Sequence, residues 1–154
     1  MLTPPSSMLA SFKDYAARFK SPPAKEQLRV LVVDDEEPVR KFVDRVLRDA
    51  GYTTSVAGGG PEAMAVAEAL EAVDILVTDV MMPEMSGDEL ARRLRQRDSA
   101  LKVLYLTGYS DALFKEKVTL WQDESFLDKP CSVKGLLQAV SLLFFGTLGV
   151  PGAD

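Results

Sequence analysis

The chain has 154 residues, a length typical of a single domain, and 47% of them are hydrophobic, which is enough to bury a full core. Its formal net charge of −5 argues against direct binding to nucleic acid, because proteins that bind the phosphate backbone are expected to be basic. The sequence contains one cysteine and no histidine, which excludes an internal disulfide, catalysis by histidine and metal ligation by histidine.

Residues 1–27 form an N-terminal extension that differs from the rest of the chain and has a pair of prolines near each end. Apolar residues within it recur at steps of four, three and four, which places them on one face of a short amphipathic helix: Met8, Phe12, Tyr15 and Phe19. This helix could fold back on its own domain or dock to a partner, and the pattern favours neither. Residues 1–7 lack the basic region and apolar core of a secretory signal.

From Leu28 onward, apolar runs alternate with amphipathic stretches. We predict strands at 28–33, 52–57, 73–78 and 101–106 and around 126–127, and helices at 38–49, 61–72, 86–97 and 111–120, with a last helix capped by Ser132. At the start of the third helix, Ser86 and Glu89 have the spacing of a capping box. The most apolar stretch, at 139–150, is too short to span a bilayer, so no membrane association is predicted. The single cysteine fits a cytoplasmic location.

The strands are uniformly apolar, as expected when helices cover both faces of a parallel sheet. Right-handed crossovers then lead to an α/β fold, a flavodoxin-like doubly wound sheet of five parallel strands in the order 2-1-3-4-5 with helices on both faces. We predict that this domain covers residues 28–146 and that residues 147–154 form a flexible C-terminal tail.

Polar residues stand at the carboxyl ends of four predicted strands. Asp34 and Asp35 follow the first strand and Asp79 the third, while Thr107 follows the fourth and Lys129 the fifth. In an open α/β sheet, ligands bind at this edge, near the point where the strand order reverses. The topology therefore brings three carboxylates, a hydroxyl and an ammonium group to one crevice.

Each of these residues alone has an ordinary structural explanation. Asp34 and Asp35 could cap the following helix, and the threonine and lysine could be simple strand and surface residues. Asp79 is harder to explain in this way, since Ser86 is available to cap the next helix. Together, the three carboxylates would repel one another without a cation, and oxygen ligands of this kind suit Mg²⁺. One carboxylate can then attack a phosphoryl group, whose charge a lysine and a hydroxyl can stabilise.

The chain resembles the receiver domain of two-component response regulators over residues 29–145. Four pieces carry the resemblance, each at the end of a predicted strand: VVDDE at 32–36, DVMMP at 79–83 with Ser86 and Gly87, LTG at 106–108, and FLDKP at 126–130. No single piece is specific, but all four in this order are. The resemblance implies a Mg²⁺-dependent signalling switch that is phosphorylated on an aspartate.

The resemblance also implies a role for each matching residue. Asp79 is similar to the phosphoacceptor and contributes to Mg²⁺ binding. Asp35 is similar to a direct Mg²⁺ ligand and Asp34 to a ligand that acts mainly through water. The main-chain carbonyl of Met81 would complete the protein's share of the coordination shell, and Lys129 would pair with the phosphoryl group.

The readout of phosphorylation is implied by the same resemblance. Thr107 would hydrogen-bond a phosphoryl oxygen and move toward it, and Phe126, at the position of the switch aromatic, would turn inward as Thr107 moves. The bond between Lys129 and Pro130 is expected to be cis. The readout surface would comprise the fourth predicted helix, the fifth strand and the last helix, and this surface could also support a homodimer.

Because the chain has no histidine, the phosphoryl group must come from another molecule. The resemblance implies a sensor histidine kinase or a phosphotransfer protein as donor and an unidentified protein target downstream. A docking module without chemistry would be expected to lack one of the site residues, all of which are present. A phosphohydrolase of the haloacid dehalogenase type would be expected to show Asp-x-Asp after its first strand, where this chain has Asp34-Asp35-Glu36. Residues 108–110 also resemble receivers attached to hybrid sensor kinases, so both a stand-alone regulator and part of such a kinase remain open.

Overall fold

The computed structural model describes residues 24–108 and 123–146, and the predicted helices at 8–19 and 111–120 and the predicted tail at 147–154 lie outside this part. Its elements in chain order are η1, a 3-10 helix (Lys25–Gln27), β1 (Arg29–Val33), α2 (Glu37–Asp49), β2 (Thr53–Ala57), α3 (Gly60–Ala69), β3 (Ile75–Asp79), α4 (Gly87–Arg95), β4 (Lys102–Thr107), β5 (Glu124–Asp128) and α6 (Val133–Phe145). Most predicted boundaries agree with these to within one or two residues. The end of α3 differs most, because Leu70 takes an extended conformation with ψ of 145° and stops the helix at Ala69.

The capping box predicted at the start of α4 is wrong. Ser86 precedes the helix, but its side chain accepts no hydrogen bond there. The carboxylate of Glu89 accepts hydrogen bonds from Arg92 and Arg93 instead, at 2.7 Å and 2.9 Å, because charged donors form stronger hydrogen bonds than a backbone N–H does. The predicted cap of α6 is confirmed, since the hydroxyl of Ser132 accepts a 2.9 Å hydrogen bond from the backbone N–H three residues later.

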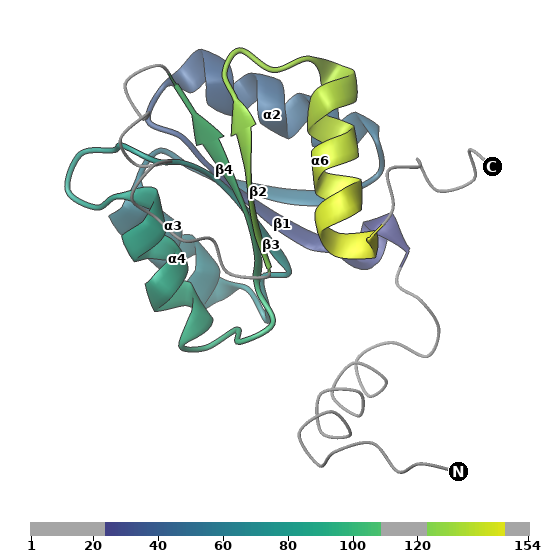
Figure 1. The fold of residues 1–154 in the computed structure, drawn as a ribbon. Coiled ribbons are helices and arrows are strands. Elements are labelled where there is room, and N and C mark those ends of the chain that lie inside the picture. Colours follow the sequence, from purple (N-terminus) through teal and green to yellow (C-terminus); the bar gives the residue numbers. More distant parts are fainter. Residues whose placement is uncertain (1–23, 109–122, 147–154) are drawn as a thin grey trace, which may run out of the picture.

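The five strands form one parallel sheet in the order β2-β1-β3-β4-β5, which confirms the predicted topology. Helices α2 and α6 cover one face of the sheet, and α3 and α4 cover the other (Figure 1). The chain builds outward from β1 to β2 and then returns to β3 on the other side of β1. The strand order therefore reverses between β1 and β3, and the crevice expected at such a point lies at their carboxyl ends.

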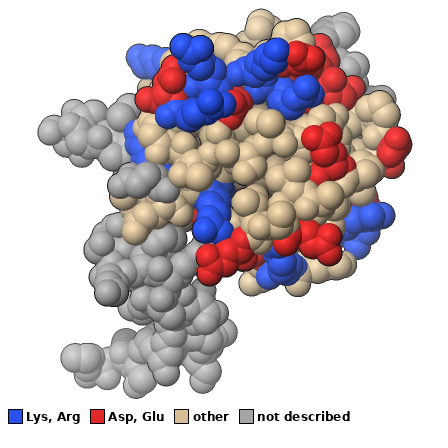
Figure 2. All heavy atoms as spheres, turned by 180° about the vertical axis from the view of Figure 1, so that it is seen from behind, with Lys and Arg blue, Asp and Glu red and all other residues tan. Residues whose placement is uncertain are grey.

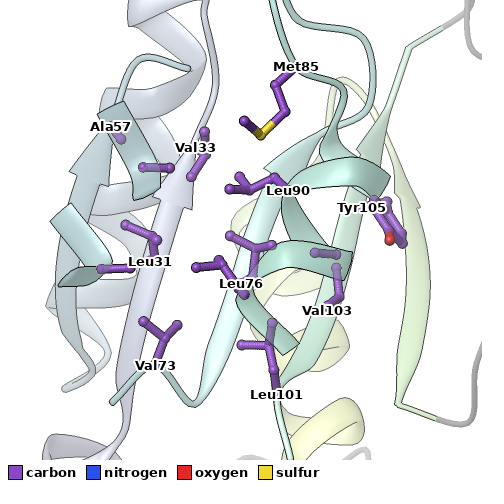
Figure 3. Packing of buried hydrophobic residues seen from close by; sticks show 14 of the residues in the cluster. Leu31, Val33, Ala57, Val73, Leu76, Met85, Leu90, Leu101, Val103 and Tyr105 are labelled. Carbon is purple, nitrogen blue, oxygen red and sulfur yellow. The ribbon is translucent and has the colours of Figure 1, made fainter. Parts of the chain in front are cut away.

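Two apolar clusters, one on each face of the sheet, hold these layers together. The three central strands are buried along almost their whole length, so their alternate side chains enter both clusters. Leu31 and Leu76 meet Leu90 of α4 in one cluster (Figure 3). Val32 of β1 and Val43 of α2 belong to the other cluster. Burying one such side chain stabilises the fold by about 1.5 to 3 kcal/mol, so the sheet is a firm support for the residues at its carboxyl edge.

Acidic and basic side chains are interspersed on the face shown in Figure 2. Ion pairs along α2 join Lys41 to Glu37 and Arg45 to Asp49. Such exposed pairs each contribute little to stability, but the mixture of signs differs from the basic surface that a nucleic-acid binder presents. Among the described residues, no helix is both long and apolar enough to cross a bilayer.

Candidate functional site

The carboxyl ends of the strands meet at one edge of the sheet because all five strands run parallel. Asp34 directly follows β1 and Asp79 is the last residue of β3. Thr107 is the last residue of β4, and Lys129 directly follows β5. The fold thus places the residues that the sequence singled out at the edge where the strand order reverses.

Asp79 lies in the middle of this edge with only 6% of its surface exposed. Its Oδ1 atom accepts a hydrogen bond from the N–H of Val80 at 2.9 Å and lies 3.2 Å from Nζ of Lys129. Burial and then the charge of Asp34 raise the pKa of Asp79 from an ordinary 3.8 to about 7, although Lys129 acts in the opposite direction. The surroundings therefore disfavour the charged carboxylate, and a metal cation beside it would stabilise that charge.

Asp34 is fully buried, and its neighbours hold both its side chain and its backbone in place. Oδ1 accepts a hydrogen bond from the N–H of Glu36 at 2.9 Å, and the main-chain carbonyl accepts one from Nη1 of Arg40 at 2.8 Å. Oδ2 lies 3.0 Å from Nζ of Lys129, and within the described part of the chain no other group is recorded as a hydrogen-bond partner for it. That oxygen therefore keeps lone pairs for a cation or for a water bound to one.

Lys129 joins the two buried carboxylates through one ammonium group, which lies 3.0 Å from Asp34 and 3.2 Å from Asp79. Burial acts to lower the pKa of Lys129, but the two neighbouring carboxylates together hold that pKa above its ordinary value. The backbone fixes the residue as well, because the N–H of Lys129 donates to the carbonyl of Thr107 at 2.8 Å. The peptide bond to Pro130 is cis, as the resemblance implied.

Asp34, Asp35 and Asp79 each offer one carboxylate oxygen, and these oxygens all lie within 4.8 Å of one another. Asp35 is exposed, whereas the other two residues are buried, so the cluster opens to solvent on one side. Mg²⁺ binds through few carboxylates and keeps several of its waters, which suits an oxygen-only cluster with an open side. The residues present therefore fit the ion that the sequence predicted.

The loop after Asp79 packs tightly against the site. The N–H of Gly87 donates to the carbonyl of Val80 at 2.7 Å, and a Cβ atom on Gly87 would lie 2.1 Å from the carbonyl oxygen of Asp79. Glycine is therefore required for the close approach of α4 to the end of β3. Met81 also belongs to this loop, and its side chain is 62% exposed. The role of the Met81 carbonyl as a metal ligand stays a prediction.

The two predicted switch residues have different neighbours. Thr107 is buried, and its Oγ1 donates to Oδ1 of Asp128 on the adjacent strand at 2.9 Å. Phe126 is partly buried and packs beside Tyr105, with ring centroids 5.8 Å apart. The structure thus brings the three predicted carboxylates and the lysine together, whereas Thr107 and Phe126, the predicted switch residues, have partners on β4 and β5.

Sequence reasoning missed two residues that support the site. Arg40 fixes the backbone of Asp34, and Oε1 of Glu36 lies 3.8 Å from Nζ of Lys129. Both residues come soon after the acidic pair at the end of β1, and Glu36 also closes the VVDDE piece that carries the resemblance. Charged residues around a helix start are usually solvated, so position alone could not show that these two contact the site.

Comparison with known proteins gives an independent assignment. The family of response regulator receiver domains matches residues 30–141. The chain is 40% identical to the sensor kinase CckA of Brucella abortus (strain 2308) over 112 residues, which are 72% of this chain and 12% of that protein. It is 31% identical to the response regulator receiver protein CpdR of the same strain over 112 residues, which are 73% of this chain and 92% of CpdR. The chain spans about half of the response regulator MprA of Mycobacterium ulcerans (strain Agy99), with 35% identity.

Solved structures show the same relationship. The receiver domain of the hybrid histidine kinase CckA has a TM-score of 0.63 and 30% identity, with 75% of this chain and 98% of that one covered. The chemotaxis response regulator CheY4 of Vibrio cholerae has a TM-score of 0.64 and 30% identity, with the same coverage of 75% and 98%. Since the family match covers most of the chain and all five strands, the chain belongs to the response regulator receiver domain family.

Proposed function

We propose that this chain is a phosphorylation-dependent signalling switch that accepts a phosphoryl group on Asp79 from a phosphohistidine of a sensor histidine kinase or phosphotransfer protein. The observation that carries this proposal is the buried Asp79 carboxylate, which lies beside the Lys129 ammonium and within a cluster of acidic oxygens that suits Mg²⁺. Phosphoryl transfer to a carboxylate needs a nucleophile, a metal cation and a further positive charge in one place. Family membership supports the coarser statement, two-component phosphorelay signalling.

In the proposed reaction, a carboxylate oxygen of Asp79 attacks phosphorus, so a P–O bond forms as the P–N bond to the donor imidazole breaks. The leaving nitrogen takes its proton from solvent. Lys129 would pair with the phosphoryl oxygens, whose charge increases in the transition state. Asp34, Asp35, Asp79 and the main-chain carbonyl of Met81 would hold Mg²⁺, which when bound neutralises charge on the carboxylates and the phosphoryl group.

The readout would follow from a change of partner at Thr107. Its hydroxyl would donate to a phosphoryl oxygen, and Phe126 would turn inward as Thr107 moves. Phosphorylation can favour this arrangement only through contacts that are better in it than in the resting one. The signal would then pass through protein contacts at residues 111–120, β5 and α6 to a target that is unidentified, and the same surface would carry a homodimer.

Self-phosphorylation of Asp79 and hydrolysis of the resulting acyl phosphate are the only chemistry in this proposal. The family match gives no support to a phosphohydrolase that acts on external esters. The chain covers nearly all of CpdR but a small part of CckA, so both a stand-alone regulator and the receiver part of a longer sensor kinase fit the relatives. We place the switch in the cytoplasm.

Intact-mass measurement after incubation with Mg²⁺ and acetyl phosphate tests the acceptor. The wild-type protein should gain one labile phosphoryl group, and chelation of Mg²⁺ or the Asp79→Asn substitution should abolish the gain. Asp49→Asn is a matched control, because it removes an exposed carboxylate at the far end of α2 that pairs with Arg45, and it should be phosphorylated like the wild type. A folded wild-type protein that gains no phosphoryl group from acetyl phosphate or from a phosphorylated sensor kinase would refute the proposal and leave a docking module.

A further inference from the structure

The hydrogen bond between Thr107 and Asp128 lies on the side of the site away from the metal cluster. The two residues are direct partners in the parallel register of β4 and β5, and Oγ1 of Thr107 donates to Oδ1 of Asp128 at 2.9 Å. Asp128 directly precedes Lys129, and successive side chains of a strand point to opposite sides. One β5 carboxylate thus engages the Thr107 hydroxyl, while the next residue reaches Asp34 and Asp79.

A threonine hydroxyl has one hydrogen to donate. If Thr107 donates it to Asp128, it cannot donate the same hydrogen to a phosphoryl oxygen on Asp79. A carboxylate is also a strong competitor for it, because hydrogen bonds to ionised acceptors are stronger than those to neutral ones. The two arrangements of the Thr107 hydroxyl are therefore mutually exclusive.

We propose that Asp128 is a positioning residue that holds the Thr107 hydroxyl away from Asp79 in the resting protein. Asp128 would thereby set how readily phosphorylation shifts the domain to its active arrangement. This inference rests on the proposed function of Asp79. Its hydrogen bond with the Thr107 hydroxyl is the contact through which we infer that Asp128 acts. Its loss should favour the active arrangement, because the resting one would lose a contact that the active one does not use.

The packing below this bond connects it to the rest of the switch. Two residues earlier on each strand, and therefore on the same face, Tyr105 pairs with Phe126 in the register of β4 and β5. Their rings lie 5.8 Å apart, and Phe126 packs against the apolar cluster on that face. The Thr107–Asp128 pair therefore lies next to the Tyr105–Phe126 pair on the same face of the sheet. Breaking the Thr107–Asp128 hydrogen bond would leave the Thr107 side chain free to move beside Phe126.

Titration with beryllofluoride and Mg²⁺, a phosphoryl mimic for aspartate, tests this role while the methyl signal of Thr107 is followed by NMR. Asp128→Ala should bind the mimic about two- to tenfold more tightly than the wild type, the range set by the net strength of one hydrogen bond. Asp128→Asn keeps an acceptor oxygen and should fall between them. In the metal-free Ala variant, the Thr107 signal should shift toward its position in the mimic-bound wild type.

A matched control exists on the far side of the molecule, where Oγ1 of Thr54 donates to Oδ1 of Asp44 at 2.5 Å. Asp44→Ala removes the same kind of threonine–aspartate bond and should leave the affinity for beryllofluoride unchanged. The Thr107→Val background distinguishes an effect of Asp128 that acts through the Thr107 hydroxyl from a general structural effect of the substitution. Asp128→Ala should have no further effect on affinity there, because the hydroxyl through which it acts is gone.

Three outcomes would overturn the inference. The first is an Asp128→Ala protein with wild-type affinity and an unmoved Thr107 signal, and the second is an Ala effect of equal size in the Thr107→Val background. Both would leave phosphorylation of Asp79 intact. In the third outcome, the wild type binds no mimic and accepts no phosphoryl group from acetyl phosphate or a kinase, so the proposed function fails and this inference fails with it. If Asp128→Ala does not fold, Asp128→Asn carries the test, and the expected result is an intermediate gain in affinity.

Discussion

The two halves of the site differ in how far they are assembled in the resting protein. On the β1 and β3 side, the Lys129 ammonium lies 3.0 Å from Asp34 and 3.2 Å from Asp79. On the β4 and β5 side, Thr107 is bonded to Asp128 instead. Buried charges must be paired to be tolerated, so the half that we propose for the chemistry has little freedom. A hydroxyl can exchange one acceptor for another at small net cost, so the half that we propose for the readout is the one expected to move.

The largest expected effect is the loss of Lys129. Lys129→Ala should lower the rate of phosphorylation by acetyl phosphate about 100- to 1000-fold, the cost typical of removing one group that stabilises transition-state charge. Mg²⁺ binding should persist or become tighter, because the ammonium that competes for Asp34 and Asp79 is gone. Intact-mass kinetics and Mg²⁺ titration measure the two effects.

Lys102→Ala is the control for this prediction, since Lys102 pairs with Asp123 at 2.5 Å at the opposite end of the sheet. It should be phosphorylated at the wild-type rate. If Lys129→Ala were phosphorylated as fast as this control, the ammonium group of Lys129 beside Asp34 and Asp79 would have no role in the chemistry.

A smaller but still substantial effect is expected from Gly87→Ala. The added Cβ would meet the carbonyl oxygen of Asp79 at 2.1 Å, so α4 must shift away from the end of β3. We expect a loss of about 2 to 4 kcal/mol in the free energy of unfolding, measured with urea, as for severe overpacking against the backbone. Gly59→Ala should change the unfolding free energy much less, because a Cβ on Gly59 has no neighbour within 4 Å in the described part. Equal losses in both variants would show that the contact with Asp79 is not what requires glycine.

The raised pKa of Asp79 predicts a pH-dependent gain in stability for Asp79→Asn without Mg²⁺. The folded-state pKa of about 7 lies above the ordinary 3.8, so the folded protein binds more protons than the unfolded chain between these values. Wild-type stability must therefore fall as pH rises through this window. At about pH 8 the variant should be more stable by about 1 to 3 kcal/mol, and this advantage should shrink toward about pH 4.

Urea unfolding in the presence of a chelator, at several pH values, measures this advantage. Added Mg²⁺ should reduce it, because the ion offsets the repulsion that the substitution removes. An advantage that is the same at low and high pH would mean that the charge of Asp79 is not its cause.

The smallest expected effect is a difference in stability between losing the serine before α6 and losing the serine before α4. Ser132→Ala should cost about 0.5 to 2 kcal/mol in the free energy of unfolding, because the hydroxyl caps the first turn of α6. Ser86→Ala should cost less than about 0.5 kcal/mol, since its side chain makes no capping bond at α4. Chemical denaturation of both variants measures this difference, and an equal cost would restore the capping box that the structure does not show.

Local patterns in the sequence were sufficient for the α/β fold, the strand order and the edge at which the site lies. Apolar runs and helical spacing depend on neighbours along the chain, and parallel strands bring their carboxyl ends together in any such sheet. Asp79 could be singled out from the sequence because it ends an apolar strand and was not needed to cap the next helix. The capping box failed because Glu89 had stronger partners on its own helix, which spacing alone does not rank.

Only the tertiary structure decided which partner each polar group takes. Three contacts depend on distances between separate elements. Arg40 donates a hydrogen bond to the backbone of Asp34, Gly87 packs against the carbonyl of Asp79, and the Thr107 hydroxyl donates to Asp128. A hydrogen bond is lost over a fraction of an ångström, whereas the hydrophobic pattern tolerates larger shifts. The sequence by itself therefore determined what kinds of groups gather at this edge, and the packing of the strands determined which of them are bound to one another.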